Sequence, residues 1–271
     1  MQRRMEELDR LDREFGLGTL PSPRPARSRP RRTTGPVLPS LVISALLVGG
    51  IIALSPSENL RTLRRLAGFD DQRAGFVPEL VDGSGSYRFT RTQPGTDEPV
   101  GYDPCRAIEV VVNPQGAPAN YDDLLDTALA HTSGATGLRF ERVGLTESRD
   151  LNQQSLDGTR SPVLVAWATA DEVPELAGDV AGIGGSLPAD RGTGRLRYVT
   201  GKVILDGETF EKFGKAEAPL AQAIVDHEFG HLVGLAHVDD PQELMYEDNV
   251  GVTAYGPGDR EGLARLGRVD C

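Results

Sequence analysis

The eleven residues His227–His237 read HEFGHLVGLAH and carry the strongest structural signal in the chain. His227 and His231 are four positions apart, so on a helix both imidazoles lie on the same face. Gly234 lets the backbone leave the helix in a conformation that other residues resist. The turn that follows can bring His237 back toward the pair. The stretch therefore predicts a helix that ends in a tight turn, with three imidazoles gathered at one point.

This arrangement of ligands is typical of a catalytic zinc site, which has three protein ligands and one open position. Three of the four histidines of the chain belong to the motif. Glu228 follows the first ligand and can reach a water on the metal, so it is the candidate catalytic base. The alternative is a buried helix whose histidines only form hydrogen bonds. We predict one Zn²⁺ bound by His227, His231 and His237, with no other cofactor-binding residues.

The residues after the motif extend the pattern through Asp240-Pro241 to Met245-Tyr246, with Met245 eight positions beyond His237. Here the chain resembles the metzincin metallopeptidases, and among them the matrixins. Val238 and Glu247 stand where matrixins usually carry Ser and Pro. The resemblance implies a methionine turn beneath the metal, formed by Met245. An ordinary core methionine is the alternative.

The resemblance also implies the fold class, α+β. We expect a twisted mixed sheet of about five strands, one of them an edge strand, backed by two helices plus a C-terminal helix. The residue patterns agree, since they alternate or cluster apolar residues in this order. The expected strands are Ile108–Val112, Leu138–Val143, Pro162–Ala168, Val180–Leu187 and Lys202–Asp206, and the expected helices begin near Asn120, Ala218 and Asp259. The glycine-rich segment Val180–Leu187 is the candidate edge strand, with a plain glycine-rich turn as the alternative.

Four regions are expected along the chain. Residues 1–36 carry nine Arg and five Asp or Glu, together with many prolines, and predict a disordered tail in the cytoplasm. Residues 37–54 are uncharged and just long enough to cross a bilayer as a signal anchor. A cleaved signal peptide is the alternative. Residues 55–84 read as a stalk, and residues 85–271 as the catalytic domain.

The arginines before the anchor outnumber those after it, which favours a single-pass membrane protein with its catalytic domain outside the cell. Outside the cytoplasm a pair of thiols tends to oxidise, so Cys105 and Cys271 are expected to form a disulfide. The alternative is a cysteine switch, in which a thiolate occupies the zinc, but no Pro-Arg-Cys-Gly segment is present.

The net charge of -11 argues against a nucleic-acid partner. Asp206 and Glu208 are weak candidates for calcium ligands. His131 is the one histidine outside the motif, and we expect it to be a surface or packing residue. Matrixins often hold a second zinc through several further histidines, which this chain does not have. Asp239 or Asp240 can support the motif by hydrogen bonds, or lie in a solvated loop.

The predicted function is zinc-dependent endopeptidase activity on extracellular or cell-surface proteins, with Glu228 activating a zinc-bound water. A membrane-anchored binding protein with an idle zinc site is the alternative. A third class, the structural zinc module, would need a fourth protein ligand near the motif.

Overall fold

The computed structural model describes residue 10 and residues 73–80, 85–151, 160–190, 192, 194–248 and 251–271. The chain divides into two compact units, Met1–Phe69 and Asp70–Cys271. In the first unit, Arg10 is described and is helical and exposed. The second unit contains the sheet, the helices and the motif, and the following paragraphs concern this unit.

The predicted membrane localisation is corrected by the structure. Within the described ranges no helix is both long enough and apolar enough to cross a bilayer. The longest ones have 16 residues, about 24 Å at 1.5 Å per residue, and a bilayer core is about 30 Å thick. The segments expected as tail and anchor, 1–36 and 37–54, lie outside the described residues except for residue 10, as does most of the expected stalk. Residues 73–80 of that stalk belong to the second unit, where Ala74 N donates to Pro104 O at 2.9 Å.

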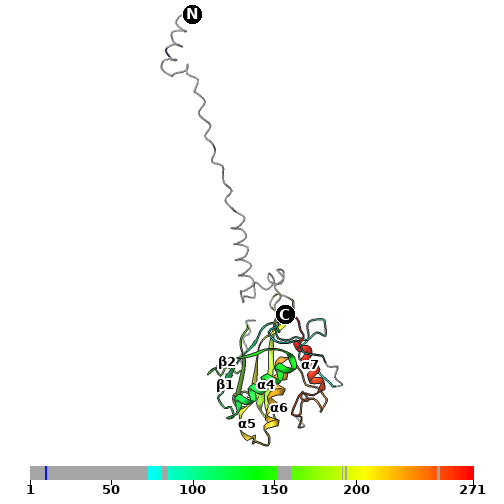
Figure 1. Ribbon diagram of the computed structural model, residues 1–271. Helices are drawn as coiled ribbons and strands as arrows, with labels where there is room; N and C mark the ends of the chain where they lie inside the picture. The colour runs from blue at the N-terminus through cyan, green and yellow to red at the C-terminus, as the bar shows by residue number, and fades with distance from the viewer. Residues whose placement is uncertain are drawn as a thin grey trace. The chain divides into compact units, whose positions relative to one another are not determined.

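The second unit is built on one five-stranded sheet with the strand order β2-β1-β3-β5-β4 (Figure 1). Four strands, β2, β1, β3 and β5, run parallel to one another. The fifth strand, β4, lies at the edge and runs antiparallel to β5. Their bounds are Ile108–Asn113 for β1, Phe140–Leu145 for β2, Val163–Ala168 for β3, Gly182–Asp190 for β4 and Leu196–Asp206 for β5. The predicted α+β fold with a mixed sheet and an edge strand is confirmed.

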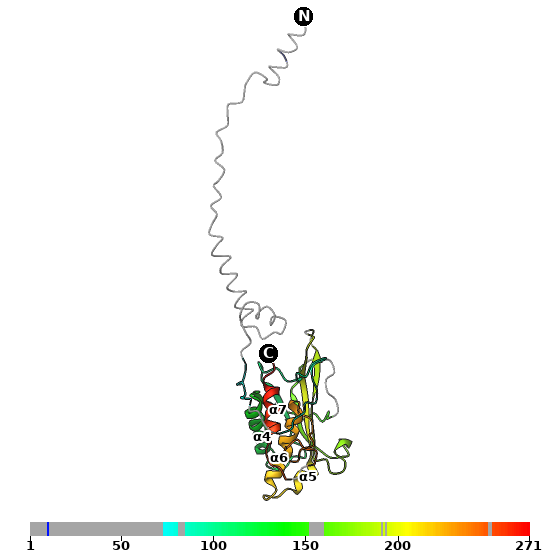
Figure 2. The ribbon, with the colours of Figure 1, turned by 90° about the vertical axis from the view of Figure 1, so that its right-hand side faces the viewer.

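Three long helices lie together on one side of this sheet (Figure 2). They are α4 at Tyr121–Thr136, α6 at Ala218–Val233 and α7 at Pro257–Gly267. A short helix, α5 at Gly207–Lys212, connects β5 to α6, and a 3-10 helix, η2 at Pro174–Leu176, precedes β4. Helix α6 packs on β4 and β5, and α4 packs on α6 and α7. The main core lies between the sheet and these helices and includes Trp167, Phe229 and Leu232, all fully buried.

Two elements differ from the sequence prediction. Strand β5 begins at Leu196, six residues before the expected Lys202, because it forms a hairpin with β4 that extends to the pair Asp190 and Leu196. Helix α5 was not expected. The Asp206 carboxylate caps it by accepting hydrogen bonds from Glu208 N at 3.2 Å and from Thr209 Oγ1 at 2.5 Å. This capping gives Asp206 a structural role. Calcium binding by Asp206 and Glu208 stays a prediction.

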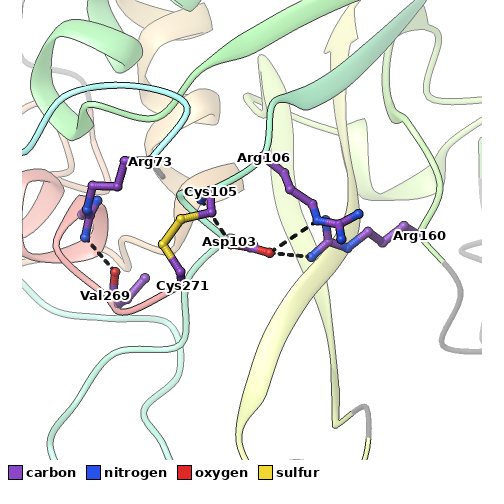
Figure 3. The surroundings of a disulfide bond; sticks show 8 residues. Arg73, Asp103, Cys105, Arg106, Arg160, Val269 and Cys271 are labelled. Atoms are coloured by element: carbon purple, nitrogen blue, oxygen red, sulfur yellow. Dashed lines mark hydrogen bonds and ion pairs between the residues drawn. A yellow bond between two sulfur atoms is a disulfide. The ribbon is translucent and has the colours of Figure 1, made fainter. Parts of the chain in front are cut away.

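The expected disulfide between Cys105 and Cys271 is present, with the two Cα atoms 5.5 Å apart (Figure 3). It joins the segment before β1 to the C-terminal residue. Beside it, Arg73 Nη2 donates to Val269 O at 2.7 Å, and the buried Asp103 carboxylate accepts from Arg160 Nη2 at 3.0 Å. These contacts hold both ends of the second unit together on one side.

Candidate metal centre

Helix α6 presents the first two histidines of the motif. Its start agrees with the sequence, since Pro219 occupies the first turn, where a missing N–H costs nothing. Phe229 and Leu232 bury the opposite face in the core. His227 and His231 therefore lie side by side on the other face, with ring centroids 4.7 Å apart.

The turn after α6 brings His237 to the same point. Gly234 ends the helix with φ of +124°, a conformation that side chains rarely adopt. A Cβ at this position would also lie only 3.0 Å from a methyl of Leu266. The segment Arg88–Thr90 stabilises this turn by backbone pairing. Thr90 N donates to Gly234 O and Ala236 N donates to Arg88 O, both at 2.8 Å. The tight turn predicted at Gly234 is present, and the role of His237 as a metal ligand stays a prediction.

The three Nε2 atoms converge. His237 Nε2 lies 3.1 Å from His227 Nε2 and 2.9 Å from His231 Nε2. Two nitrogens bound to a tetrahedral zinc at 2.0–2.1 Å would be about 3.3 Å apart. The spacing thus fits a single small cation bound by all three imidazoles.

The other ring nitrogens show why a cation fits better than hydrogen bonds among the rings. His227 Nδ1 lies 2.7 Å from Leu244 O, and His231 Nδ1 lies 2.8 Å from Leu235 O. A carbonyl oxygen can only accept, so each Nδ1 carries the proton and each Nε2 presents a lone pair. With this tautomer both His227 and His231 direct a lone pair toward His237 Nε2, an arrangement that a bound metal accommodates.

The electrostatics keep these imidazoles neutral. Burial lowers the pKa of His227 to about 4 and that of His231 to about 3, with His227 adding to the effect on His231. Burial also lowers the pKa of His237. Neutral imidazole is the form that binds a metal. The donor set of three such rings fits Zn²⁺, as the sequence predicts.

Glu228 lies beside the triad against the edge strand. Its side chain is 6 % exposed. Burial raises the pKa of its carboxyl to about 8, and a hydrogen bond from Gly184 N–H acts in the opposite direction. A Cβ on Gly184 would lie 2.1 Å from Glu228 O, and one on Gly182 would lie 2.8 Å from Glu228 Cγ. The glycines of β4 thus let α6 approach the strand closely enough to place Glu228 at the metal centre.

Met245 packs beneath the helix of the motif. It is 1 % exposed, and its Sδ would lie 2.5 Å from a Cβ placed on Gly230. Gly230, between the two helical histidines, therefore makes room for the methionine. Met245 thus contacts the helix between His227 and His231, and its role as a methionine turn stays a prediction. The requirement for glycine at position 230 was not expected.

A pair of buried carboxylates behind Met245 was missed by the sequence analysis. Asp259 accepts hydrogen bonds from Leu244 N at 2.5 Å and from Gly256 N at 2.9 Å, and Glu243 accepts from Gly258 N and Asp259 N, both at 2.9 Å. Both residues are at most 1 % exposed. They fix the turn whose carbonyl, Leu244 O, receives the His227 proton. The one local signal in the sequence was the Gly256-Pro257-Gly258 helix start, with Asp259 in the first turn.

Thr90 was also missed. Its Oγ1 donates to Leu235 O at 2.8 Å, and the same oxygen accepts from His231 Nδ1. Thr90 therefore helps to hold the carbonyl that orients the second ligand. No pattern around position 90 in the sequence points to this contact, because it joins segments 145 residues apart.

A cleft of about 820 Å³ opens beside the triad. One wall is the start of β4 with the segment before it, and the other is the chain from Tyr246 to Asp248. Residues lining the cleft include the three histidines, Glu228, Glu175, Asp179, Val180, Leu220, Ile224, Tyr246, Glu247 and Asp248.

The remaining candidates have other surroundings. His131 is half exposed and pairs with the buried Asp226, with Nδ1 2.8 Å from Oδ2. Asp240 Oδ1 accepts from Gln242 N at 3.0 Å, in a turn before Met245. Backbone carbonyls, not Asp239 or Asp240, accept from the Nδ1 atoms of the two helical ligands.

No model of a known protein family matches this chain. The resemblance to the metzincins rests on the residues of the motif and of the turn that contains Met245.

Proposed function

We propose that this protein is a zinc-dependent endopeptidase of metzincin type. The observation that carries the proposal is the convergence of three Nε2 atoms beside a buried carboxylate in an open cleft. The residues are His227, His231 and His237 as ligands, with Glu228 as the acid-base group.

A zinc ion bound here would supply Lewis acidity, which polarises a peptide carbonyl and acidifies water. Within the described residues, the cluster of ligand atoms contains these three histidines and no fourth His, Cys or carboxylate. A site with three protein ligands leaves a position open for chemistry, whereas a structural zinc site is closed by a fourth. The donor set therefore favours a catalytic role.

Glu228 is suited to move protons. A general base works best when its pKa lies near the working pH, and burial places the pKa of this carboxyl at about 8. A nearby dication favours the ionised form. Glu228 would accept a proton from the attacking water and return it to the leaving amine. Gly184 N–H orients the carboxylate during both transfers.

The substrate would be a protein or peptide in extended form. Strand β4 forms the edge of the sheet and lines the cleft. An extended segment can pair with such an edge through main-chain hydrogen bonds, which position the scissile bond independently of sequence. The cleft is open at the surface, so an internal segment of a longer chain can enter it.

The test uses the purified full chain loaded with zinc. Wild type is expected to cleave casein or gelatin, and chelation to abolish the cleavage. Glu228→Ala is expected to lose about 10²–10⁴-fold in rate while retaining one zinc per chain, measured by elemental analysis. His231→Ala is the matched variant that should lose the metal itself.

The same measurements separate the alternative, a binding protein with an idle zinc site. That reading predicts zinc bound by wild type with no cleavage of any protein substrate. Undiminished cleavage by Glu228→Ala would exclude the proposed role of Glu228.

A further inference from the structure

We propose that the cleft selects peptides that carry a lysine or arginine beside the scissile bond. The inference rests on the proposed function, and it concerns residues that do not take part in the chemistry. It joins two features of the cleft, an apolar wall and an acidic rim.

The apolar wall continues the face of α6 that carries the ligands. Ile224 and Leu220 precede His227 by three and seven positions, which places them one and two turns away on the same face. Both are half-buried and line the cleft. Val180, two residues before β4, lines the same cleft with 38 % of its surface exposed. These side chains can cover an aliphatic stem.

The acidic rim lies on both sides of this wall. Glu175 and Asp179 precede β4, and Glu247 and Asp248 follow Tyr246. All four are exposed. Among the described residues that line the cleft, none is a lysine or arginine. Glu247 and His237 line the same cleft, so the rim reaches the candidate metal centre.

A lysine or arginine side chain matches both features at once. Its methylene stem packs on apolar surface, and its charged end remains near water and carboxylates. A neutral apolar residue would leave the rim without a partner, and an acidic residue would be repelled by it. The partner chemistry is therefore a cationic side chain in an extended peptide.

The test compares two quenched peptides, identical except for Arg or Glu beside the cleaved bond, with the zinc-loaded full chain. Exposed ion pairs are individually weak, but replacing Arg by Glu turns attraction into repulsion, so kcat/KM should fall about tenfold or more. The preference should shrink as salt is raised. A randomised library then gives the position of the basic residue.

Two variants remove charge from the rim, Glu247→Gln/Asp248→Asn and Glu175→Gln/Asp179→Asn. At least one is expected to bring the Arg-to-Glu ratio toward one. The matched control, Glu141→Gln/Glu147→Gln, removes two exposed carboxylates at or next to β2, the opposite edge of the sheet, and should keep the wild-type ratio. The proposal is overturned if both rim variants keep the wild-type Arg-to-Glu ratio of kcat/KM. It is also overturned if the wild type cleaves the two peptides equally well.

Binding of the same peptides to chelator-treated protein, measured by fluorescence anisotropy, separates this inference from the proposed function. If no peptide is cleaved but the Arg peptide binds more tightly and loses this advantage in a rim variant, the inference stands and the peptidase proposal fails. Equal binding of both peptides overturns the inference even if the protein is a peptidase.

Discussion

The carboxylates of Glu243 and Asp259 are linked through the backbone, because each accepts a hydrogen bond from an amide at or next to the other residue. Asp259 N donates to Glu243 Oε2 at 2.9 Å, and Leu244 N donates to Asp259 Oδ2 at 2.5 Å. The Leu244 carbonyl in turn accepts the His227 Nδ1 proton. A carboxylate pair outside the histidine cluster thus holds the turn that orients His227.

Asp259→Asn should destabilise the protein and weaken zinc binding. Burial raises the pKa of Asp259 to about 6, so at pH 7 it is mainly a carboxylate that accepts from backbone N–H groups. An asparagine replaces one acceptor by an N–H donor and leaves an amide unsatisfied, at a cost of about 1–3 kcal/mol. Urea unfolding and zinc competition with a chelator measure the two effects. Exposed Asp270→Asn is the control, and equal behaviour of the two variants would contradict the role of Asp259.

Thr90→Val should weaken zinc binding without unfolding the chain. The substitution removes the hydroxyl that donates to Leu235 O, the acceptor of the His231 Nδ1 proton. Loss of such a supporting contact typically lowers metal affinity about 10-fold or more. Chelator competition gives the affinity, and circular dichroism tests the fold. Thr90→Ser keeps the hydroxyl and should restore the affinity. A Val variant with wild-type affinity would remove Thr90 from the site.

Gly184→Ala should lower both stability and activity, and Gly185→Ala should change neither strongly. A Cβ at 184 would lie 2.1 Å from Glu228 O, whereas a Cβ at 185 meets nothing within 4 Å. Forcing β4 and α6 apart is expected to cost about 1–3 kcal/mol and to displace Glu228. Thermal unfolding and kcat/KM provide the measurements. Similar losses in both variants would contradict the prediction, because the effect would then not depend on the close contact between Gly184 and α6.

Glu228→Gln should stabilise the chelator-treated protein at high pH. The pKa of this carboxyl rises on folding from 4.5 to about 8 through burial. Its contribution to stability is therefore fully present below pH 4.5 and is lost as the pH rises through 8. Glutamine does not ionise, so the variant should gain roughly 2–4 kcal/mol over wild type at pH 8.5 and little at pH 4.5.

Differential scanning fluorimetry across this pH range tests the prediction. Zinc is the internal control, because a bound dication favours the carboxylate and should reduce the gain. An advantage of Glu228→Gln that does not vary with pH would point to packing instead of ionisation.

The sequence by itself predicted the candidate ligands, the candidate base and the elements near them. His227, Glu228 and His231 follow from helical spacing, Gly234 from the need for a positive φ, and Met245 from its distance to His237. These are local relationships, encoded within about twenty residues. The disulfide and the mixed sheet with its edge strand were also predicted. The predicted membrane localisation is not supported, because no helix among the described residues could cross a bilayer, and residues 37–54 lie outside the described residues.

The tertiary structure alone decided what supports the site. Thr90, Glu243 and Asp259 act on the histidines through backbone carbonyls and amides from other segments, which no spacing rule reveals. The need for glycine at 182, 184 and 230 arises because α6 touches β4 and Met245 at van der Waals distance. The long β4–β5 hairpin depends on pairing across a turn. Contacts between distant segments depend on how the whole core packs. The sequence therefore identifies the candidate residues, whereas only the fold identifies the backbone groups and side chains that each one contacts.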